Sequence, residues 1–368
     1  MIAVASLALM ACACMVSLTA TMMLVKVGNR TGTLDTAGVE GQVKREARRV
    51  PNIGGLGIVL GIVVPLVAAF GAAAAGLSPT DLVSEDLTVG IATESRAAVV
   101  VLGGLIAVHV LGLVDDRVPL PWLPKLLFML AVPAIVAWQS DTRVLTALDG
   151  IVGGAWLSVL LTALWFAVTM NAINFMDNMD GLAGGTACVI AAAIAGVGLK
   201  QEQWLVAGAA ACVSGAALGF LPLNFPRAKI FMGDGGSLAL GFSLAFLTTR
   251  LTYVDTDGTD PRWDRIIIPF VLLAVPLYDM LSVVAIRLSQ GRSPFLGDLQ
   301  HLSHRFEGRG LSRPRVAVAV WTLTLIVGLG AVIVTDGSPA HSMVIAAQTL
   351  GALALLAVVE RGMPWRGA

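Results

Sequence analysis

Apolar runs long enough to cross a membrane recur from one end of this sequence to the other. A helix needs about 20 apolar residues to cross roughly 30 Å of hydrocarbon. Of the 368 residues, 57% are hydrophobic and 13% are charged, against about 25% charged residues in soluble domains. The pattern predicts an all-α, polytopic integral membrane protein with about eleven transmembrane helices in a single domain, residues 1–368. The predicted spans are 2–25, 53–76, 97–114, 124–139, 151–170, 183–199, 204–222, 237–250, 266–287, 315–335 and 341–359.

Lysine and arginine are distributed unevenly among the segments that join these spans. If the N-terminus lies outside, the inner segments hold 18 of the 24 basic residues. Basic residues in short loops favour the cytoplasmic side of a membrane. We therefore expect a bacterial inner-membrane protein whose N-terminus lies outside and whose C-terminus lies in the cytoplasm.

The apolar run that begins at Ile2 is long enough to span and follows no charged region, so we interpret it as an uncleaved first helix and not as a signal peptide. The four cysteines lie within apolar runs and lack zinc-finger spacing, which indicates buried thiols. Acidic and basic residues are equal in number. This balance gives no indication of a nucleic-acid partner, and we expect none.

Five acidic residues fall at the predicted inner ends of spans or in short loops beside them. These are Asp115, Asp116, Asp177, Asp180 and Asp234. Asp115 and Asp116 directly end an apolar run, and two adjacent carboxylates at a helix C-terminus repel each other and the helix dipole. This arrangement favours a bound cation or a basic partner. In the alternative interpretation, the two carboxylates merely extend into the lipid headgroup region.

The stretch from Asn171 to Gly181 also carries polar residues at intervals of three to four, including Asn174, Asp177 and Asn178. Such spacing places side chains on one helical face or in a tight turn. Carboxylate and amide oxygens suit Mg²⁺, and amides can also read the edge of a nucleobase. A helix cap alone would need one such residue, so the run indicates a binding site.

Asp234 lies in a glycine-rich turn just before an apolar segment. It could cap a helix. However, glycines let backbone N–H groups approach an oxyanion, and a helix N-terminus favours phosphate. An acidic residue in such a turn is best explained if it holds a metal ion that itself binds phosphate.

The last inner loop contains His301, His304 and Arg305, followed by two further arginines. Imidazoles beside arginine could clamp a pyrophosphate, because the guanidinium offers a planar fork of donors. A two-histidine zinc site is the rival, but neither a cysteine nor a third histidine lies nearby. With the acids, this loop predicts Mg²⁺-dependent phosphoryl transfer on the cytoplasmic face, between a lipid-borne and a soluble substrate.

In these motifs and their order, the sequence resembles the polyprenyl-phosphate N-acetylhexosamine-1-phosphate transferases, the superfamily that also contains the phospho-MurNAc-pentapeptide translocase. Five inner loops match in order and cover nearly the whole chain. They are Lys44 with Pro51-Asn-Ile-Gly-Gly55, Asp115-Asp116 with Lys125, the run from Asn174 to Asp180, Phe231-Met-Gly-Asp234, and His301-Leu-Ser-His-Arg305.

The resemblance implies that a UDP-N-acetylhexosamine and undecaprenyl (polyprenyl) phosphate react to give a polyprenyl-diphospho-sugar and UMP, and we expect the transferred group to be GlcNAc-1-phosphate. By position, Asp234 and Asn174 would hold Mg²⁺, or Mn²⁺ in its place, and Lys125 would grip the pyrophosphate. Asp115 and Asp116 would activate or position the lipid phosphate. The remaining implied substrate-binding residues are Lys44, Asp177, Asn178 and Asp180, the latter two facing the uracil, and His301, His304 and Arg305.

Two alternatives stay open at this point. The first is phospho-MurNAc-pentapeptide transfer in peptidoglycan synthesis. The second is a cation- or proton-coupled transporter, which would suit His109 and Asp279 within predicted spans. Transporter sites lie near the bilayer midplane, whereas most of the motifs here fall at inner ends. The resemblance also allows a homodimer, since relatives dimerise.

Overall fold

A computed structural model of the chain describes residues 2–31, 50–75, 85–251, 263–293, 300–335 and 338–362. The described part is built from helices. The long ones are α1 (Ile2–Thr31), α2 (Gly55–Ala74), α3 (Glu85–Asp115), α4 (Trp122–Gln139), α6 (Trp156–Met176), α7 (Leu182–Lys200), α8 (Trp204–Asn224), α9 (Gly233–Arg250), α11 (Ala274–Ser289), α13 (Arg313–Val334) and α14 (Pro339–Gly362). The short ones are α5 (Asp149–Val152), α10 (Ile268–Leu272) and α12 (Leu302–Glu307), with 3₁₀ turns η1 (Thr146–Leu148) and η2 (Trp263–Ile267).

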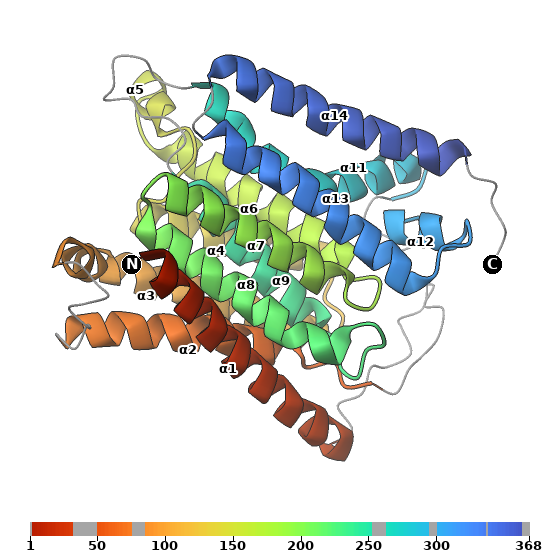
Figure 1. The fold of residues 1–368 in the computed structure, drawn as a ribbon, viewed down its shortest axis with the longest axis horizontal. Helices are drawn as coiled ribbons and strands as arrows, with labels where there is room; N and C mark the ends of the chain where they lie inside the picture. Colours follow the sequence, from red (N-terminus) through yellow and green to blue (C-terminus); the bar gives the residue numbers. More distant parts are fainter. Residues whose placement is uncertain are drawn as a thin grey trace.

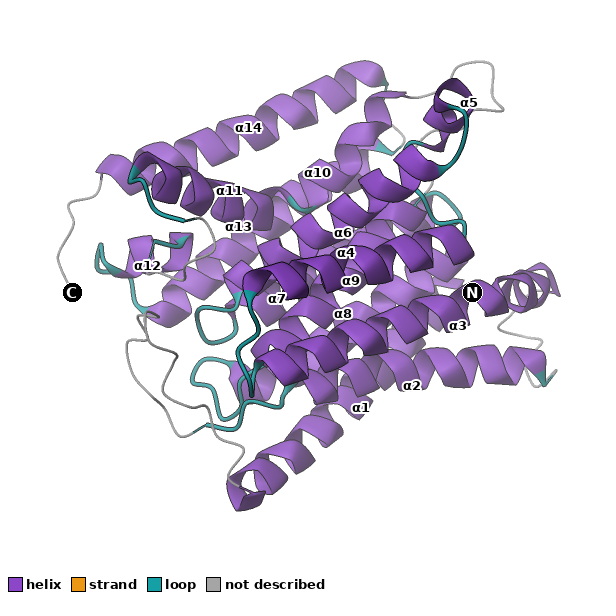
Figure 2. Ribbon diagram, turned by 180° about the vertical axis from the view of Figure 1, so that it is seen from behind, coloured by secondary structure: helices purple, strands orange, loops and turns teal. Residues whose placement is uncertain are grey.

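The long helices lie side by side and form one bundle, with successive helices running in opposite directions (Figure 1). Their ends therefore gather at two opposite ends of the molecule. The start of α1 lies at one end, and the last turn of α14 lies at the other, on the right in Figure 1. Figure 2 shows several of the connecting loops of this second end gathered below α12.

Each of the eleven predicted segments overlaps a helix, but the predicted number of spans was slightly high. Nine of the described helices are long and apolar enough to cross a membrane, or ten if η2–α10 and α11, bent by 71° at Leu273, form one broken span. The exception is segment 237–250. It corresponds to α9, which begins earlier than predicted, has Asp234 in its first turn and ends at Arg250.

Helix α9 lies inside the bundle, which explains why it can be less apolar than the others. It packs against α2, α3 and α6, and 13 of its 18 residues are buried. The rings of Phe242 on α9 and Phe166 on α6 meet edge to face, with centroids 5.0 Å apart. A helix enclosed by protein does not need a continuous lipid-facing surface. The protein is thus a multi-pass membrane protein with one helix at its centre.

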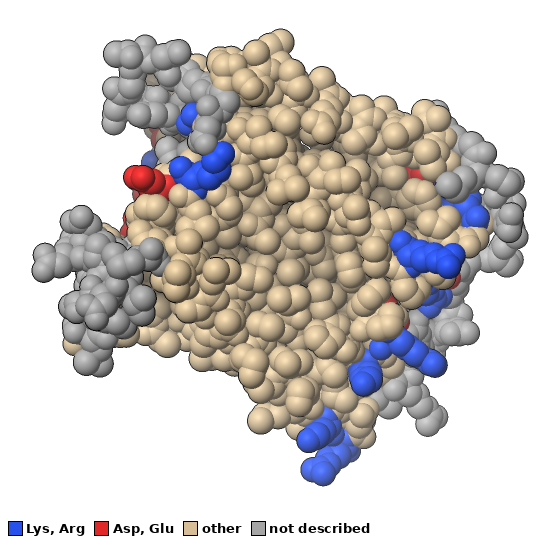
Figure 3. All heavy atoms as spheres, viewed as in Figure 1, with Lys and Arg blue, Asp and Glu red and all other residues tan. Residues whose placement is uncertain are grey.

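The charged side chains on the face shown in Figure 3 lie towards the two ends of the bundle. Basic residues are unevenly shared between these ends. At the end that holds the loop after α3, the described ones are Lys26, Arg30, Arg117, Lys125, Arg227, Lys229, Arg287, Arg292, Arg305, Arg309, Arg313 and Arg315. At the opposite end, they are Arg96, Arg143, Lys200, Arg250 and Arg265.

Close approach of backbones fixes where α3 meets the start of α9. A Cβ atom added to Gly112 would lie 2.4 Å from the backbone nitrogen of Gly235 and 2.5 Å from the carbonyl oxygen of Asp234. Small residues allow membrane helices to approach this closely. The last turn of α3 is therefore pressed against the first turn of α9, and Asp115 and Asp234 are brought to the same place.

This contact can be tested with a matched pair of substitutions on α3. We expect Gly112→Ala to lower the midpoint of thermal unfolding in detergent, because overpacking against a backbone costs about 1–3 kcal/mol. Gly103→Ala is the control, since its Cβ would meet no atom within 4 Å and alanine favours a helix by about 1 kcal/mol over glycine. Equal midpoints for the two variants would contradict the packing described here.

Candidate active site

Four helix ends bring predicted site residues together at the basic end of the bundle. The Lys125 ammonium, in the first turns of α4, lies 2.7 Å from Asp115 Oδ2 at the end of α3. The same ammonium also pairs with Asp234 Oδ2 at the start of α9. At the end of α6, Asn174 donates from Nδ2 to Asp234 Oδ1 at 2.9 Å and to Ser237 Oγ at 2.9 Å. The Lys125 ammonium thus links the two carboxylates, and the Asn174 amide links Asp234 to the hydroxyl of Ser237.

The turn between α3 and α4 makes this meeting possible. The backbone N–H of Leu120 donates to Asp115 Oδ1 at 2.7 Å, so the carboxylate stabilises the turn that follows its own helix. Pro121 lies in an extended conformation immediately before α4. The chain therefore reverses within a few residues, and Lys125 returns to the level of Asp115.

Asp116 has different partners from its neighbour. Its carboxylate accepts hydrogen bonds from the backbone N–H groups of Asp234 at 2.9 Å and Gly235 at 3.2 Å, and from Asn52 Nδ2 at 3.2 Å. A carboxylate at a helix N-terminus is favourable because the dipole attracts negative charge. These two amides of the glycine-rich turn, which the sequence suggested for a phosphate, are thus bonded to Asp116.

The surroundings of Asp116 also change its acidity. Burial and the nearby Asp234 carboxylate raise the pKa of Asp116 to about 6, although its three hydrogen bonds oppose the rise. Gly233 allows this close contact: its φ is +67°, and an added Cβ would lie 2.4 Å from Asp116 Oδ2. The position therefore requires glycine for its backbone conformation and for space.

The acids after α6 complete the cluster. Burial raises the pKa of Asp177 well above its usual range, and the carboxylates of Asp234, Asp116 and Asp180 raise it further. Asp180 accepts a hydrogen bond from the backbone N–H of Ala228 at 3.1 Å. Gly181, with φ of +76°, closes the turn. The cluster as a whole carries more negative charge than Lys125 balances.

Asn178 and the histidine-containing loop lie against the same turn. Asn178 Nδ2 donates to the Phe175 carbonyl at 2.5 Å, and Ser303 Oγ donates to Asn178 Oδ1. The His301 ring meets Phe175 edge to face at 5.3 Å. The structure thus brings α12 beside the end of α6, which is necessary if the residues of both are to bind one substrate.

Asp279 on α11 holds the start of α12 in position. Its side chain is 1% exposed, and its Oδ2 lies 2.9 Å from His301 Nδ1, while Oδ1 accepts the backbone N–H of Leu302 at 2.6 Å. His109, the other ionisable residue expected within a span, makes a buried hydrogen bond from Nδ1 to the Gly235 carbonyl at 2.9 Å. Asp279 therefore supports the start of α12, and His109 supports the start of α9.

His304 and Arg305 of α12 each lie beside a glutamate. His304 Nδ1 lies 3.6 Å from Glu307 Oε2. Arg305 donates from Nη2 to Ser282 Oγ at 2.8 Å, and its Nη1 lies 3.3 Å from Glu360 Oε2. Lys44, which the sequence also assigned to the site, lies outside the described residues.

Comparison with known proteins identifies the family. Residues 98–252 match Glycosyl transferase family 4. The chain is 33% identical over 332 residues to the decaprenyl-phosphate N-acetylglucosaminephosphotransferase of Mycobacterium leprae (strain TN), covering 85% of this chain and 78% of that protein. The chain belongs to Glycosyl transferase family 4. It is therefore a prenyl-phosphate sugar-1-phosphate transferase, as the sequence motifs predicted, and the transporter alternative has no support.

Two further relatives of the transferase have related names. One is the probable undecaprenyl-phosphate N-acetylglucosaminyl 1-phosphate transferase of Bacillus subtilis (strain 168), 29% identical over 292 residues, 78% of this chain and 74% of the relative. The other is the undecaprenyl-phosphate alpha-N-acetylglucosaminyl 1-phosphate transferase of Escherichia coli (strain K12), 32% identical over 194 residues, 49% and 51% of the two chains.

The residues of the transferase fit a magnesium ion by charge and by ligand type. Asp234 and Asn174 carry hard oxygen ligands, and a divalent cation would offset the excess negative charge. The Asp234 oxygens are bonded to Lys125 and to Asn174 Nδ2, so an ion would replace these contacts. No three His, Cys, Asp or Glu side chains in the described part form a ready-made metal site. Mg²⁺ commonly keeps several waters and takes phosphate oxygens from its substrate, so Asp234 and Asn174 would suffice as protein ligands.

The transferase site also contains residues that the sequence analysis did not select. Besides Ser303, they are Asn52, Ser237 and Arg287. Asn52 lies within the first-loop motif, so its position was a usable signal. Arg287 is 2% exposed, and its guanidinium lies 5.5 Å from the centre of the Phe175 ring. In the sequence, Arg287 is an ordinary basic residue at the end of an apolar run, and nothing marked it for burial.

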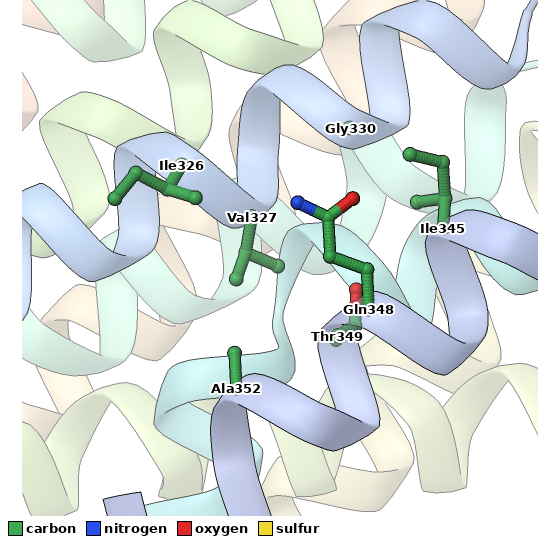
Figure 4. Close-up of a pocket in the computed structure, with 7 residues that line it drawn as sticks. All are labelled: Ile326, Val327, Gly330, Ile345, Gln348, Thr349 and Ala352. Atoms are coloured by element: carbon green, nitrogen blue, oxygen red, sulfur yellow. The ribbon is translucent and has the colours of Figure 1, made fainter. Parts of the chain in front are cut away.

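A small crevice between α13 and α14 lies apart from these residues and takes no part in the site. Its lining is mostly apolar, with Gln348 as an exposed polar side chain (Figure 4). The lining residues are Ile326, Val327, Gly330, Ile345, Gln348, Thr349 and Ala352.

The metal assignment predicts a stability change that can be measured without catalysis. Ligands that bind only the folded state raise the unfolding midpoint. We expect millimolar Mg²⁺, with or without UDP, to raise the midpoint of the wild-type protein but not of Asp234→Asn. Asp141→Asn is the control, because Asp141 is exposed at the opposite end and pairs there with Arg143. Equal shifts in all three proteins would exclude Asp234 as a ligand.

Proposed function

We propose that this transferase moves GlcNAc-1-phosphate from UDP-GlcNAc to undecaprenyl phosphate at the cytoplasmic face of a bacterial inner membrane, giving polyprenyl-diphospho-GlcNAc and UMP. The product would start a cell-envelope glycan. The observation that carries the proposal is the convergence of Asp115, Lys125, Asn174 and Asp234 at the ends of four helices. The names of the Bacillus and Mycobacterium relatives support GlcNAc and a polyprenyl phosphate.

The reaction is a displacement at the β-phosphorus of the UDP-sugar. An oxygen of the lipid phosphate forms the new bond, the bond from the β-phosphorus to the bridging oxygen breaks, and that oxygen leaves with UMP. We favour this direct attack over a covalent aspartyl intermediate. Such a displacement needs alignment and charge neutralisation more than covalent assistance from the protein.

The residues of the cluster would divide this work. Magnesium, when held by Asp234 and Asn174, would neutralise charge on the diphosphate. Lys125 has three donors, so it can donate to a diphosphate oxygen while it stays paired with Asp115. Asp115 lies at the end of a spanning helix, the level at which a lipid phosphate arrives. It would orient the attacking oxygen or accept its proton.

The nucleotide and sugar would lie towards the turn after α6 and α12. In the proposed arrangement, Asp180 and Asn178 face the uracil, and His301, His304 and Arg305 face the diphosphate or the sugar. Asp177 and Lys44 complete the proposed set of substrate-binding residues. The buried Arg287 adds a further positive charge near Phe175.

Release of UMP tests the proposed function directly. Purified protein in detergent with Mg²⁺ should form UMP from UDP-GlcNAc only when polyprenyl phosphate is present, with C55 and C50 lipids compared. We expect Asp234→Asn and Lys125→Gln each to lower kcat by at least about 100-fold, since both act on charge that develops during transfer. Gln348→Ala, outside the site, should retain wild-type rates.

The donor panel decides the sugar. UDP-MurNAc-pentapeptide, UDP-GalNAc and UDP-glucose are assayed beside UDP-GlcNAc under the same conditions. A clear preference for UDP-MurNAc-pentapeptide would replace GlcNAc-1-phosphate transfer with a role in peptidoglycan synthesis. UMP formation without any lipid acceptor would contradict the proposed reaction.

The proposed orientation predicts labelling by a membrane-impermeant maleimide in intact cells. The four native cysteines are first replaced, and one cysteine is then introduced at an exposed glutamine at either end of the bundle. Gln139→Cys, at the end of α4, should be labelled from outside. Gln290→Cys, just after α11, should be labelled only after the cells are opened. The reverse pattern would place the basic end outside.

A further inference from the structure

The last helix of the chain brings a buried glutamate to the active-site end. Glu360 lies near the end of α14 and is 5% exposed. Its Oε2 lies 3.3 Å from Arg305 Nη1 on α12, and Tyr278 of α11 and Arg309 also lie beside it. Glutamate is rarely buried unless it is paired. We therefore ask whether this buried glutamate does more than anchor a membrane helix.

Anchoring alone is a poor explanation. Helix α14 also contacts α13, α11 and η2, and at its other end Ser342 bonds to Asp264. Removing two charges from water offsets much of the attraction between them, so a buried ion pair stabilises a fold weakly compared with apolar packing.

The pair does, however, fix the direction of a guanidinium. Arg305 donates from Nη2 to Ser282 Oγ at 2.8 Å, while Glu360 holds Nη1. The two partners come from different helices, α11 and α14. Because the guanidinium is planar and its donors form a rigid fork, two such contacts determine its orientation. The guanidinium has five N–H donors and these contacts use one on each Nη, so the group keeps donors for a further contact.

We propose that Glu360 is a positioning residue, which orients the Arg305 guanidinium for the diphosphate or the sugar of the nucleotide donor. Helix α14 is then part of the active site and not only a membrane anchor. The inference rests on the proposed function, in which Arg305 contacts the donor. It goes further by assigning a role to a helix that carried no recognisable motif in the sequence.

The test separates binding of the donor from binding of the lipid. Steady-state kinetics are measured for Glu360→Gln, which keeps the shape of the side chain but removes its charge. We expect KM for UDP-GlcNAc to rise about tenfold, the effect of weakening one hydrogen bond that involves a charged group. KM for polyprenyl phosphate should stay unchanged. Glu360→Asp, which keeps the charge, should recover part of the donor affinity.

Two further variants exclude a merely structural effect. In an Arg305→Lys background, Glu360→Gln should raise KM for the donor little further, because residues that act through one another are non-additive. Gln348→Ala, on the same helix but in the crevice of Figure 4, should behave as wild type. Unfolding midpoints are measured for every variant.

The outcomes distinguish this inference from the function on which it rests. If wild-type protein forms UMP and Glu360→Gln leaves KM for the donor unchanged, or changes the KM values of donor and lipid alike, Glu360 does not position Arg305. Full additivity with Arg305→Lys would overturn the inference as well. If the wild-type protein forms no UMP with any donor, the proposed function itself is wrong, and the inference is wrong with it.

Discussion

The ammonium of Lys125 is the interaction on which the site depends. It lies between Asp115 and Asp234 and thereby allows the ends of α3 and α9 to meet. Carboxylates that are brought together away from bulk water repel one another strongly. A single cation relieves this repulsion only in part, since Asp116 and Asp177 lie in the same cluster and burial and neighbouring carboxylates raise the pKa of each. The arrangement is therefore suited to a second, divalent cation and to a substrate that brings phosphate oxygens.

The centre of the bundle supplies the rigidity that such a cluster needs. Helix α9 carries Asp234 in its first turn and is enclosed by α2, α3 and α6. Asp116 bonds to its first backbone amides, and Gly112 of α3 approaches it without a side chain. A catalytic carboxylate must be held within a fraction of an ångström. A helix inside the protein holds it more firmly than a helix at the lipid boundary.

Much of this could be predicted from the sequence, and the limits have physical causes. Apolar run lengths located every long helix, and the order of the motifs predicted which acids would meet. The predicted number of spans was too high because it included α9. This helix mixes glycine and serine with apolar residues, and it can do so because it is enclosed by protein and not by lipid. The partners of Asp116, Asp279 and Arg287 could not be predicted from the sequence. Each partner is at least 20 residues away along the chain or lies on another helix. Such contacts depend on how the helices pack.

The adjacent acids Asp115 and Asp116 show why a motif does not assign roles by itself. Successive residues on a helix point about 100° apart, so two neighbouring carboxylates at a helix end start out in different directions. Asp115 turns to Lys125, whereas Asp116 turns to the backbone of α9 and to Asn52. Only Asp115 shares a cation with Asp234. The motif thus combines one carboxylate that pairs with the lysine of the cluster with one that holds the start of α9, the helix that carries Asp234.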